Sequence, residues 1–173
     1  MKVLLVEDHT LVRRGLAQLL VTCVKGAEVT EAADADQAAE ILKHTAHDVA
    51  LVDVRLGPYS GLDLLSELAE RRPGILTVVM TAHGVVDTAV QALRIGAYDY
   101  LSKPFDQTEL FATIDRCFER VELQRARIDA EAARGNGHRH GGQGRTFGPS
   151  RQQDLLLLAV ASDPTGHGSR GGA

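Results

Sequence analysis

Polar side chains follow apolar runs at several places between residues 1 and 105. They are the carboxylates of Glu7, Asp8 and Asp53, the hydroxyl of Thr81 and the ammonium of Lys103. Carboxylate oxygens are hard ligands that suit Mg²⁺, which usually binds one or two protein carboxylates together with waters and phosphate oxygens. The three carboxylates and the one ammonium leave two negative charges, which a single Mg²⁺ would neutralise. These residue types therefore favour metal-assisted chemistry on a phosphoryl group, provided that the fold brings them together.

One of these carboxylates can also act as a nucleophile. A carboxylate attacks phosphorus to form a covalent aspartyl phosphate in several enzyme classes. Lys103 and the Thr81 hydroxyl, together with bound Mg²⁺, would then hold the transferring oxygens. Positioning and charge stabilisation of this kind are the main requirements of phosphoryl transfer.

The elements that must position these side chains alternate regularly along the chain. The apolar runs predict strands at residues 2–6, 28–32, 49–54, 76–81 and 98–102. Apolar spacings of three and four predict helices at residues 11–22, 36–44, 61–71 and 86–95, and one from residue 107 to about residue 134. Such alternation indicates an α/β fold whose parallel sheet is covered on both faces. We expect a doubly wound, five-stranded, flavodoxin-like (βα)5 sheet with strand order 2-1-3-4-5.

A parallel sheet of this kind explains how distant residues would meet. The carboxyl ends of its strands lie at one edge, and ligands of open α/β sheets bind outside that edge. Glu7, Asp8, Asp53, Thr81 and Lys103 all fall at or just after predicted strand ends. The sequence therefore predicts one site at this edge.

Composition excludes several other classes of protein. The chain has 173 residues, 44% hydrophobic and 24% charged, which is typical of a globular domain with a short appendage. Its longest apolar run, residues 155–161, is too short to cross a membrane, and no secretory signal is present, so we expect a cytoplasmic protein without membrane association. Cys23 and Cys117 are far apart, which favours reduced thiols. The net charge of −4, with its acidic excess in residues 1–122, argues against direct DNA binding.

Several segments together resemble the receiver domain of bacterial two-component response regulators. They are residues 3–9, 51–56 with 60–62, 79–82 and 96–105, and the resemblance extends over residues 1–122. It implies a phosphoprotein that acts as a switch in a two-component phosphorelay and in transcription regulation. The expected partner is a histidine kinase or a phosphotransfer protein, and the expected cofactor is Mg²⁺. Beyond phosphorylation and dephosphorylation of itself, no enzyme activity is implied.

By this resemblance Asp53 is the phosphoacceptor. Asp8 binds Mg²⁺ directly, Glu7 helps through water, and the backbone carbonyl of Arg55 completes the protein ligands together with Asp53. The family usually has a proline four residues after the acceptor, whereas this chain has Gly57 there, followed by Pro58. We therefore expect a looser or differently turned loop, although the glycine expected at position 61 is present.

The remaining family positions concern how the phosphoryl group is held and sensed. Lys103 matches the phosphoryl-binding lysine, and its bond to Pro104 is expected to be cis, a form essentially restricted to proline. Thr81 and Tyr100 match a switch pair, in which the hydroxyl turns toward the phosphoryl group and the aromatic ring then turns inward.

Two other classes of function fit the sequence less well. Aspartate-nucleophile phosphatases of the haloacid dehalogenase type share the chemistry, but they need a second aspartate two residues after the nucleophile, where this chain has Arg55. A DNA-binding transcription factor would need a recognition helix, and no helix-turn-helix pattern is present.

The chain after the receiver-like region divides into two parts. Residues 123–134 extend the last helix, either as a solvated helix or as a weak coiled coil that would make a homodimer, and residues 135–173 form a Gly/Arg-rich tail that we expect to be flexible. Residues 146–151 resemble the opening of the ATPase domain of sigma-54-dependent, NtrC-type regulators, yet no Gly-Lys-Ser/Thr phosphate loop follows. We therefore expect no ATPase and interpret the tail as a remnant of such a domain, left by truncation or frameshift, or as the end of a receiver-only protein.

Overall fold

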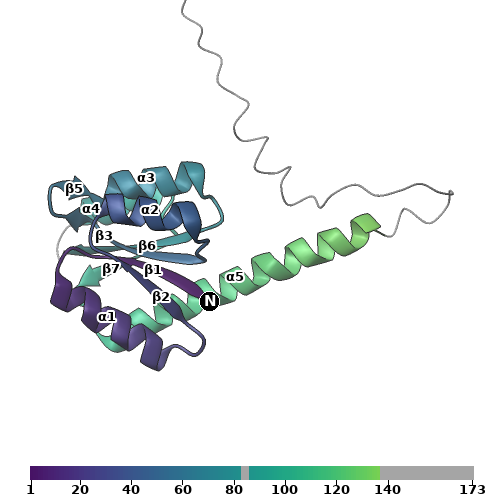
Figure 1. Ribbon diagram of the computed structural model, residues 1–173, viewed down its shortest axis with the longest axis horizontal. Helices are drawn as coiled ribbons and strands as arrows, with labels where there is room; N and C mark the ends of the chain where they lie inside the picture. Colours follow the sequence, from purple (N-terminus) through teal and green to yellow (C-terminus); the bar gives the residue numbers. More distant parts are fainter. Residues whose placement is uncertain (83–85, 137–173) are drawn as a thin grey trace, which may run out of the picture. The chain divides into compact units, whose positions relative to one another are not determined.

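One parallel sheet forms the centre of the computed structural model, which describes residues 1–82 and 86–136. Its strands are β1 (Lys2–Val6), β2 (Glu28–Ala32), β3 (Val49–Asp53), β6 (Leu76–Ala82) and β7 (Asp99–Lys103). They lie in the order β2-β1-β3-β6-β7, and every neighbouring pair is parallel (Figure 1). This order is the predicted 2-1-3-4-5, so the predicted fold class is confirmed.

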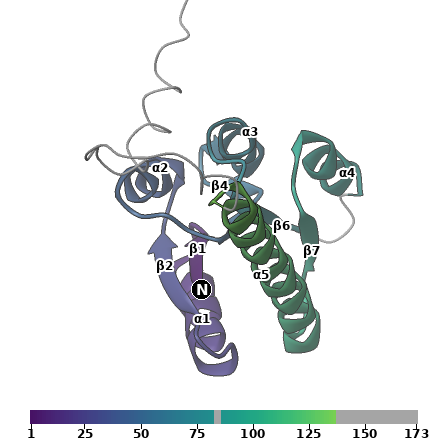
Figure 2. The same ribbon diagram turned by 90° about the vertical axis from the view of Figure 1, so that its right-hand side faces the viewer.

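Five helices cover the two faces of the sheet. They are α1 (Thr10–Cys23), α2 (Ala35–His44), α3 (Gly61–Arg71), α4 (Val86–Ile95) and α5 (Gln107–Asn136). Helices α1 and α5 lie on one face, and α2, α3 and α4 lie on the other (Figures 1 and 2). Among the described residues, no helix combines the length and the apolar character needed to cross a bilayer.

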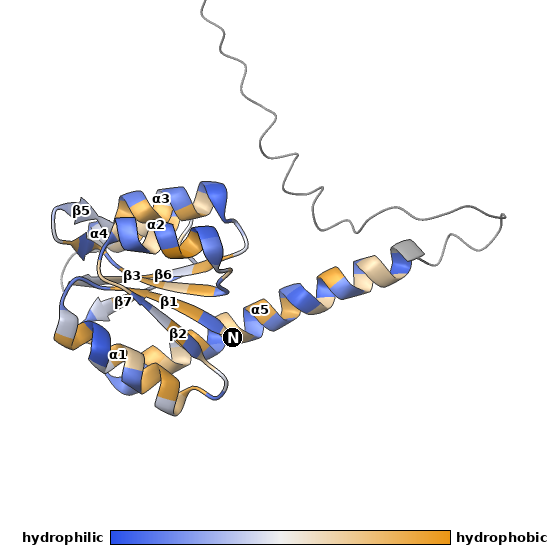
Figure 3. Cartoon of the chain, in the orientation of Figure 1, coloured by the Kyte–Doolittle hydropathy of each residue, from blue (hydrophilic) through white to orange (hydrophobic). Residues whose placement is uncertain are grey.

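The apolar runs of the central strands are buried on both sides. In β1, Val3 and Leu5 pack with residues of α1 and α5, whereas Leu4 and Val6 pack with residues of α2 and α3. Hydrophobic residues accordingly concentrate in the strands and on the sheet-facing sides of the helices (Figure 3). The period of two along a strand sends alternate side chains to opposite faces, so a strand covered twice must be apolar throughout.

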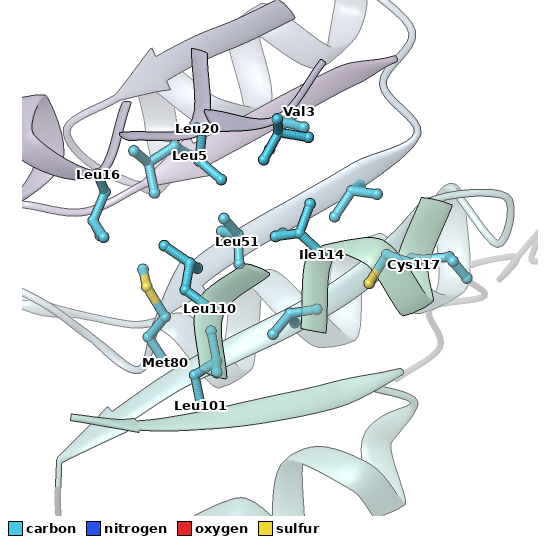
Figure 4. Close-up of a cluster of buried hydrophobic side chains, with 14 of the residues drawn as sticks. Val3, Leu5, Leu16, Leu20, Leu51, Met80, Leu101, Leu110, Ile114 and Cys117 are labelled. Carbon is cyan, nitrogen blue, oxygen red and sulfur yellow. The ribbon is translucent and has the colours of Figure 1, made fainter. Parts of the chain in front are cut away.

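Helix α5 supplies the largest share of helical side chains to one core. Its residues Leu110, Ile114 and Cys117 belong to one buried cluster with Leu51 and other strand residues (Figure 4). Burial raises the pKa of the Cys117 thiol to about 12. Both cysteines are free, as predicted, and Cys23 is exposed.

A short hairpin between β3 and α3 was not predicted from the sequence. Strands β4 (Arg55–Leu56) and β5 (Tyr59–Ser60) pair antiparallel across the two residues Gly57 and Pro58. Gly57 has φ +60°, a left-handed value that suits glycine at the first central position of a tight hairpin turn. The segment after Asp53 is therefore a tight turn rather than a loose loop.

Helix α5 continues well past the sheet core. Val121 is 4% exposed, whereas Leu123 and Ile128 are 66% and 65% exposed. The Arg125 guanidinium forms an ion pair with Asp48, at 2.7 Å, just before β3. By its contacts the chain divides into Met1–Ala133 and Arg134–Ala173. The predicted tail lies outside the described residues from residue 137 onward.

Candidate functional site

The carboxyl edge of the sheet holds an open cleft beside the predicted acceptor. Its volume is about 530 Å³, and it is lined by Glu7, Asp8, His9, Val12, Asp53, Arg55, Gly57, Ala82 and Lys103. Glu7 and Asp8 follow β1, Asp53 ends β3 and Lys103 ends β7. The structure thus brings together four of the five side chains that were expected to meet at this edge because they lie at or just after the ends of strands.

The Lys103 ammonium joins two of the carboxylates. Its Nζ donates to Glu7 Oε2 at 2.5 Å and to Asp53 Oδ2 at 2.7 Å. Partial burial opposes the charged form, but the hydrogen bonds and charges of Asp53 and Glu7 outweigh it and raise the pKa of Lys103 above its usual value. Lys103 therefore stays charged and holds the Asp53 carboxylate at a fixed place.

Glu7 is the most deeply buried charged group of the site. It is 0% exposed, and its second oxygen, Oε1, accepts the backbone N–H of His9 at 3.1 Å. Both of its carboxylate oxygens thus have hydrogen-bond donors from the protein. Such a carboxylate suits an indirect role at a metal site, which agrees with the role that the resemblance implies.

Asp8 is more open to the cleft. Its side chain is 29% exposed; Oδ1 lies 2.8 Å from His9 Nδ1, and Oδ2 accepts the backbone N–H of Gly57 at 2.9 Å. Partial burial favours the neutral acid, but the hydrogen bonds and charge of His9 and the hydrogen bond from Gly57 outweigh it and lower the pKa of Asp8. Asp8 is therefore an ionised, accessible carboxylate of the kind that could bind a cation.

The donor set fits a hard divalent cation. Asp8 and Asp53 offer carboxylate oxygens to the cleft, with Glu7 behind them. Oxygen ligands of this kind are those that Mg²⁺ prefers. The Arg55 amide donates to Asp53 Oδ1 at 3.2 Å and orients that carboxylate, while the Arg55 side chain is exposed. A ligand role for the Arg55 carbonyl stays a prediction.

His9 stands at the N-cap of α1, without a side-chain cap bond. Its Nδ1 also belongs to a group with Glu7 and Asp8 whose ligand atoms lie within 4.8 Å of one another. A histidine next to two acidic residues was the available signal for this placement.

Arg13 also contacts the segment that carries Glu7 and Asp8, a role that the sequence did not predict. Its Nη1 donates to the backbone oxygen of Glu7 at 2.7 Å, and its Nε lies 3.3 Å from Glu31 Oε2. Its side chain is only 13% exposed. Arg13 therefore ties the segment that carries Glu7 and Asp8 to β2.

The predicted switch residues stand apart from the cleft. Thr81 is 3% exposed, and its hydroxyl donates to the Ala82 carbonyl at 3.4 Å. Tyr100 is 42% exposed and pairs in register with Val79 on β6. As far as the chain is described, neither side chain lines the cleft.

Two backbone features complete the site. The peptide bond between Lys103 and Pro104 is cis, as predicted. Gly61 starts α3 directly against the acceptor strand, because its N–H donates to the Val54 carbonyl at 2.7 Å and an added Cβ would lie 1.9 Å from the Asp53 carbonyl oxygen. Only glycine fits at this contact.

Comparison with known proteins identifies relatives of the chain. Residues 3–115 match the response regulator receiver domain. The alginate biosynthesis transcriptional regulatory protein AlgB of Pseudomonas aeruginosa is 36% identical over 129 residues, which cover 75% of this chain and 28% of that protein. The DNA-binding transcriptional regulator NtrC of Escherichia coli is 37% identical over 126 residues, which cover 69% of this chain and 25% of that protein. The chain thus matches only about a quarter of the length of these relatives.

Solved structures agree with this relationship. The receiver domain of NtrX from Brucella abortus has a TM-score of 0.64 and 34% identity, and the match covers 68% of this chain and 98% of that domain. NtrX of the same organism in complex with ATP has a TM-score of 0.69 and 28% identity, covering 92% of this chain and 33% of that one. The predicted resemblance is confirmed, and through residues 3–115 the chain belongs to the response regulator receiver domain family, the phosphoacceptor signalling modules of two-component systems.

Proposed function

We propose that this protein is a phosphorelay switch whose Asp53 accepts a phosphoryl group from a histidine kinase or a phosphotransfer protein. The observation that carries this proposal is the Lys103 ammonium, which bridges the Asp53 and Glu7 carboxylates beside the open Asp8. Asp8, Asp53 and the Arg55 carbonyl would hold Mg²⁺, with Glu7 acting through water. When bound, the ion would neutralise charge on the phosphoryl oxygens.

The transfer itself uses this chain's own groups. An Asp53 carboxylate oxygen attacks phosphorus while the P–N bond of a phosphohistidine breaks, and the departing imidazole keeps the electron pair and takes a proton from solvent. Lys103 is already placed against Asp53 Oδ2, where it would stabilise charge on the incoming phosphoryl group. The exposed Arg55, two residues after the acceptor, argues against a haloacid dehalogenase type of phosphatase, which needs a carboxylate there.

The expected readout lies on the surface formed by α4, β7 and α5. Aspartyl phosphate adds about one negative charge and new acceptor oxygens at Asp53. We expect the Thr81 hydroxyl to exchange its weak bond to Ala82 for one to the phosphoryl group, and Tyr100 to turn inward from its exposed position. This surface would then bind a protein partner or a second copy of the chain, by which the switch acts on transcription without contacting DNA itself.

Labelling with a small phosphodonor tests the acceptor. After incubation with acetyl phosphate and Mg²⁺, intact-mass spectrometry should show one added phosphoryl group, and peptide mapping should place it on Asp53. Asp53→Asn and excess chelator should each abolish the label. Asp63→Asn, a matched change at an exposed aspartate of α3, should leave labelling unchanged. A label that persists in Asp53→Asn would refute the assignment.

The readout has its own test. Thr81→Ala should accept phosphate at Asp53, yet it should lose most of the amide chemical-shift changes that beryllofluoride, a stand-in for the phosphoryl group, causes in α4, β7 and α5. Ser102→Ala removes a hydroxyl in register with Thr81 on the neighbouring strand and should keep the response. An undiminished response in Thr81→Ala would show that this hydroxyl does not couple the two surfaces.

A further inference from the structure

The β4–β5 hairpin touches both carboxylates that face the cleft. At its start, the Arg55 amide donates to Asp53 Oδ1 at 3.2 Å, and at its turn the Gly57 amide donates to Asp8 Oδ2 at 2.9 Å. On its returning strand the Tyr59 hydroxyl donates to Asp36 Oδ2 on α2 at 3.2 Å. A segment of six residues thus joins the acceptor, the predicted metal ligand and a helix on the opposite side of the hairpin.

We infer that the Gly57 amide is a positioning group for the metal site, because it orients the Asp8 carboxylate for Mg²⁺. The inference rests on the proposed function and concerns how tightly the site holds its cation. A proline at this position, which the family usually has, carries no N–H and could not make this bond. The contribution therefore requires a residue other than proline at position 57.

The turn geometry aims the amide at Asp8. The φ of +60° at Gly57 is typical of a tight hairpin turn. The ring of Pro58 restricts the φ of the second central residue of that turn. An added Cβ at Gly57 would meet only Asp8 Oδ2, at 3.9 Å, so space is not what selects glycine here. The backbone conformation selects it, and the same conformation directs the N–H.

Asp8 has little else to hold it. The other hydrogen-bond partner of its carboxylate is the His9 ring, at 2.8 Å, and that side chain is 75% exposed. Without the Gly57 amide, the partly exposed carboxylate would have to be ordered when the cation binds, at a cost in side-chain entropy. A carboxylate oxygen that accepts one N–H keeps a lone pair for a metal, and ligating carboxylates are commonly hydrogen-bonded in this way. Loss of such an outer partner typically lowers metal affinity by about 10-fold to 100-fold.

Two double variants compare the hairpin with and without an N–H at position 57. Gly57→Pro with Pro58→Gly removes the N–H and favours a two-residue type II turn, because proline cannot adopt the positive φ of Gly57. Gly57→Asn with Pro58→Gly keeps the N–H and creates the dipeptide that most favours a tight hairpin. Tyr59→Phe is a third variant. It removes the hydrogen bond from the hairpin to Asp36 and leaves the Gly57 amide in place. Thermal unfolding of each variant verifies that the domain is folded.

The deciding measurement is the affinity for Mg²⁺. It is obtained from the amide chemical shifts of the protein during titration with Mg²⁺ alone. We expect the proline variant to bind about tenfold more weakly or worse, and the asparagine variant and Tyr59→Phe to stay within about twofold of the parent. Acetyl phosphate labelling of the proline variant should fall at low Mg²⁺ and recover as Mg²⁺ approaches saturation. Parent-like affinity in the proline variant, or an equal loss in both double variants, overturns the inference while leaving the proposed function intact. If the parent shows no saturable Mg²⁺ binding that Asp8→Asn removes, the proposed function fails and the inference fails with it.

Discussion

Replacing Lys103 with methionine should abolish acetyl phosphate labelling of Asp53 and lower the free energy of unfolding by about 3 kcal/mol. The physical reason is the Glu7 carboxylate, which is 0% exposed and has Lys103 as its cationic partner. Removing one member of a buried ion pair leaves an uncompensated charge in a medium that solvates it poorly. The value lies at the low end for such pairs because the Lys103 side chain is 26% exposed. Urea unfolding at pH 7 without added Mg²⁺ measures it.

Two further variants make the test specific. Glu7→Gln in the Lys103→Met background should recover most of the lost stability, because no buried charge is then left unpaired, but it should not recover labelling. Lys43→Met breaks an exposed pair with Glu40 on α2 and should leave the unfolding curve unchanged. A Lys103→Met protein that unfolds at the parent's urea concentration would contradict the charge balance described for the site.

Among the glycines that the structure describes, Gly61 should be the one whose replacement by alanine is most damaging. Its Cβ would lie 1.9 Å from the Asp53 carbonyl oxygen and 2.9 Å from the Val54 Cα, and both are backbone atoms at the end of the central strand. Neither α3 nor β3 can move away without breaking the Gly61 N–H to Val54 hydrogen bond and disturbing the acceptor. We expect the free energy of unfolding to fall by more than about 4 kcal/mol, which is exceptionally large for a single substitution.

A second glycine gives the matched control. Gly15 lies inside α1, and an added Cβ there meets nothing within 4 Å. Gly15→Ala should therefore raise the free energy of unfolding by about 0.5–1 kcal/mol, the usual gain of alanine over glycine in a helix. Circular dichroism during thermal unfolding compares both variants with the parent. A Gly61→Ala melting temperature equal to the parent's would show that β3 and α3 separate more easily than the geometry implies.

The sheet and most of the site were predictable because they depend on patterns that repeat. Five apolar runs separated by helical spacings define a parallel sheet, and its topology then gathers Glu7, Asp8, Asp53 and Lys103 at one edge. The cis bond before Pro104 followed from the resemblance alone. Ends of strands shifted by one residue, as at β7, without moving any of these side chains away from the edge.

The contacts that adjust the site were not predictable in the same way. Strands β4 and β5 have two residues each, which is too short for any periodicity to be seen. The bond from Gly57 to Asp8 joins residues 49 positions apart and depends on one backbone torsion. Arg13 donates to the Glu7 carbonyl and also pairs with Glu31, a residue of β2 that the strand register places beside β1. Such details depend on atomic geometry and leave little trace in residue types.

The length of α5 means that a small tilt of the helix would produce a larger displacement at its end. The helix begins just after the site, at Gln107, and its last buried residue in the core is Val121. At 1.5 Å per residue, the exposed arm from Val121 to Ala133 is about 18 Å long, so a tilt of about 10° at its root would carry its end through about 3 Å. Arg125, paired with Asp48, stands near the fulcrum of this arm. A change in packing too small to alter the sheet would therefore move Ala133 by about 3 Å, which is nearly the distance between two consecutive Cα atoms.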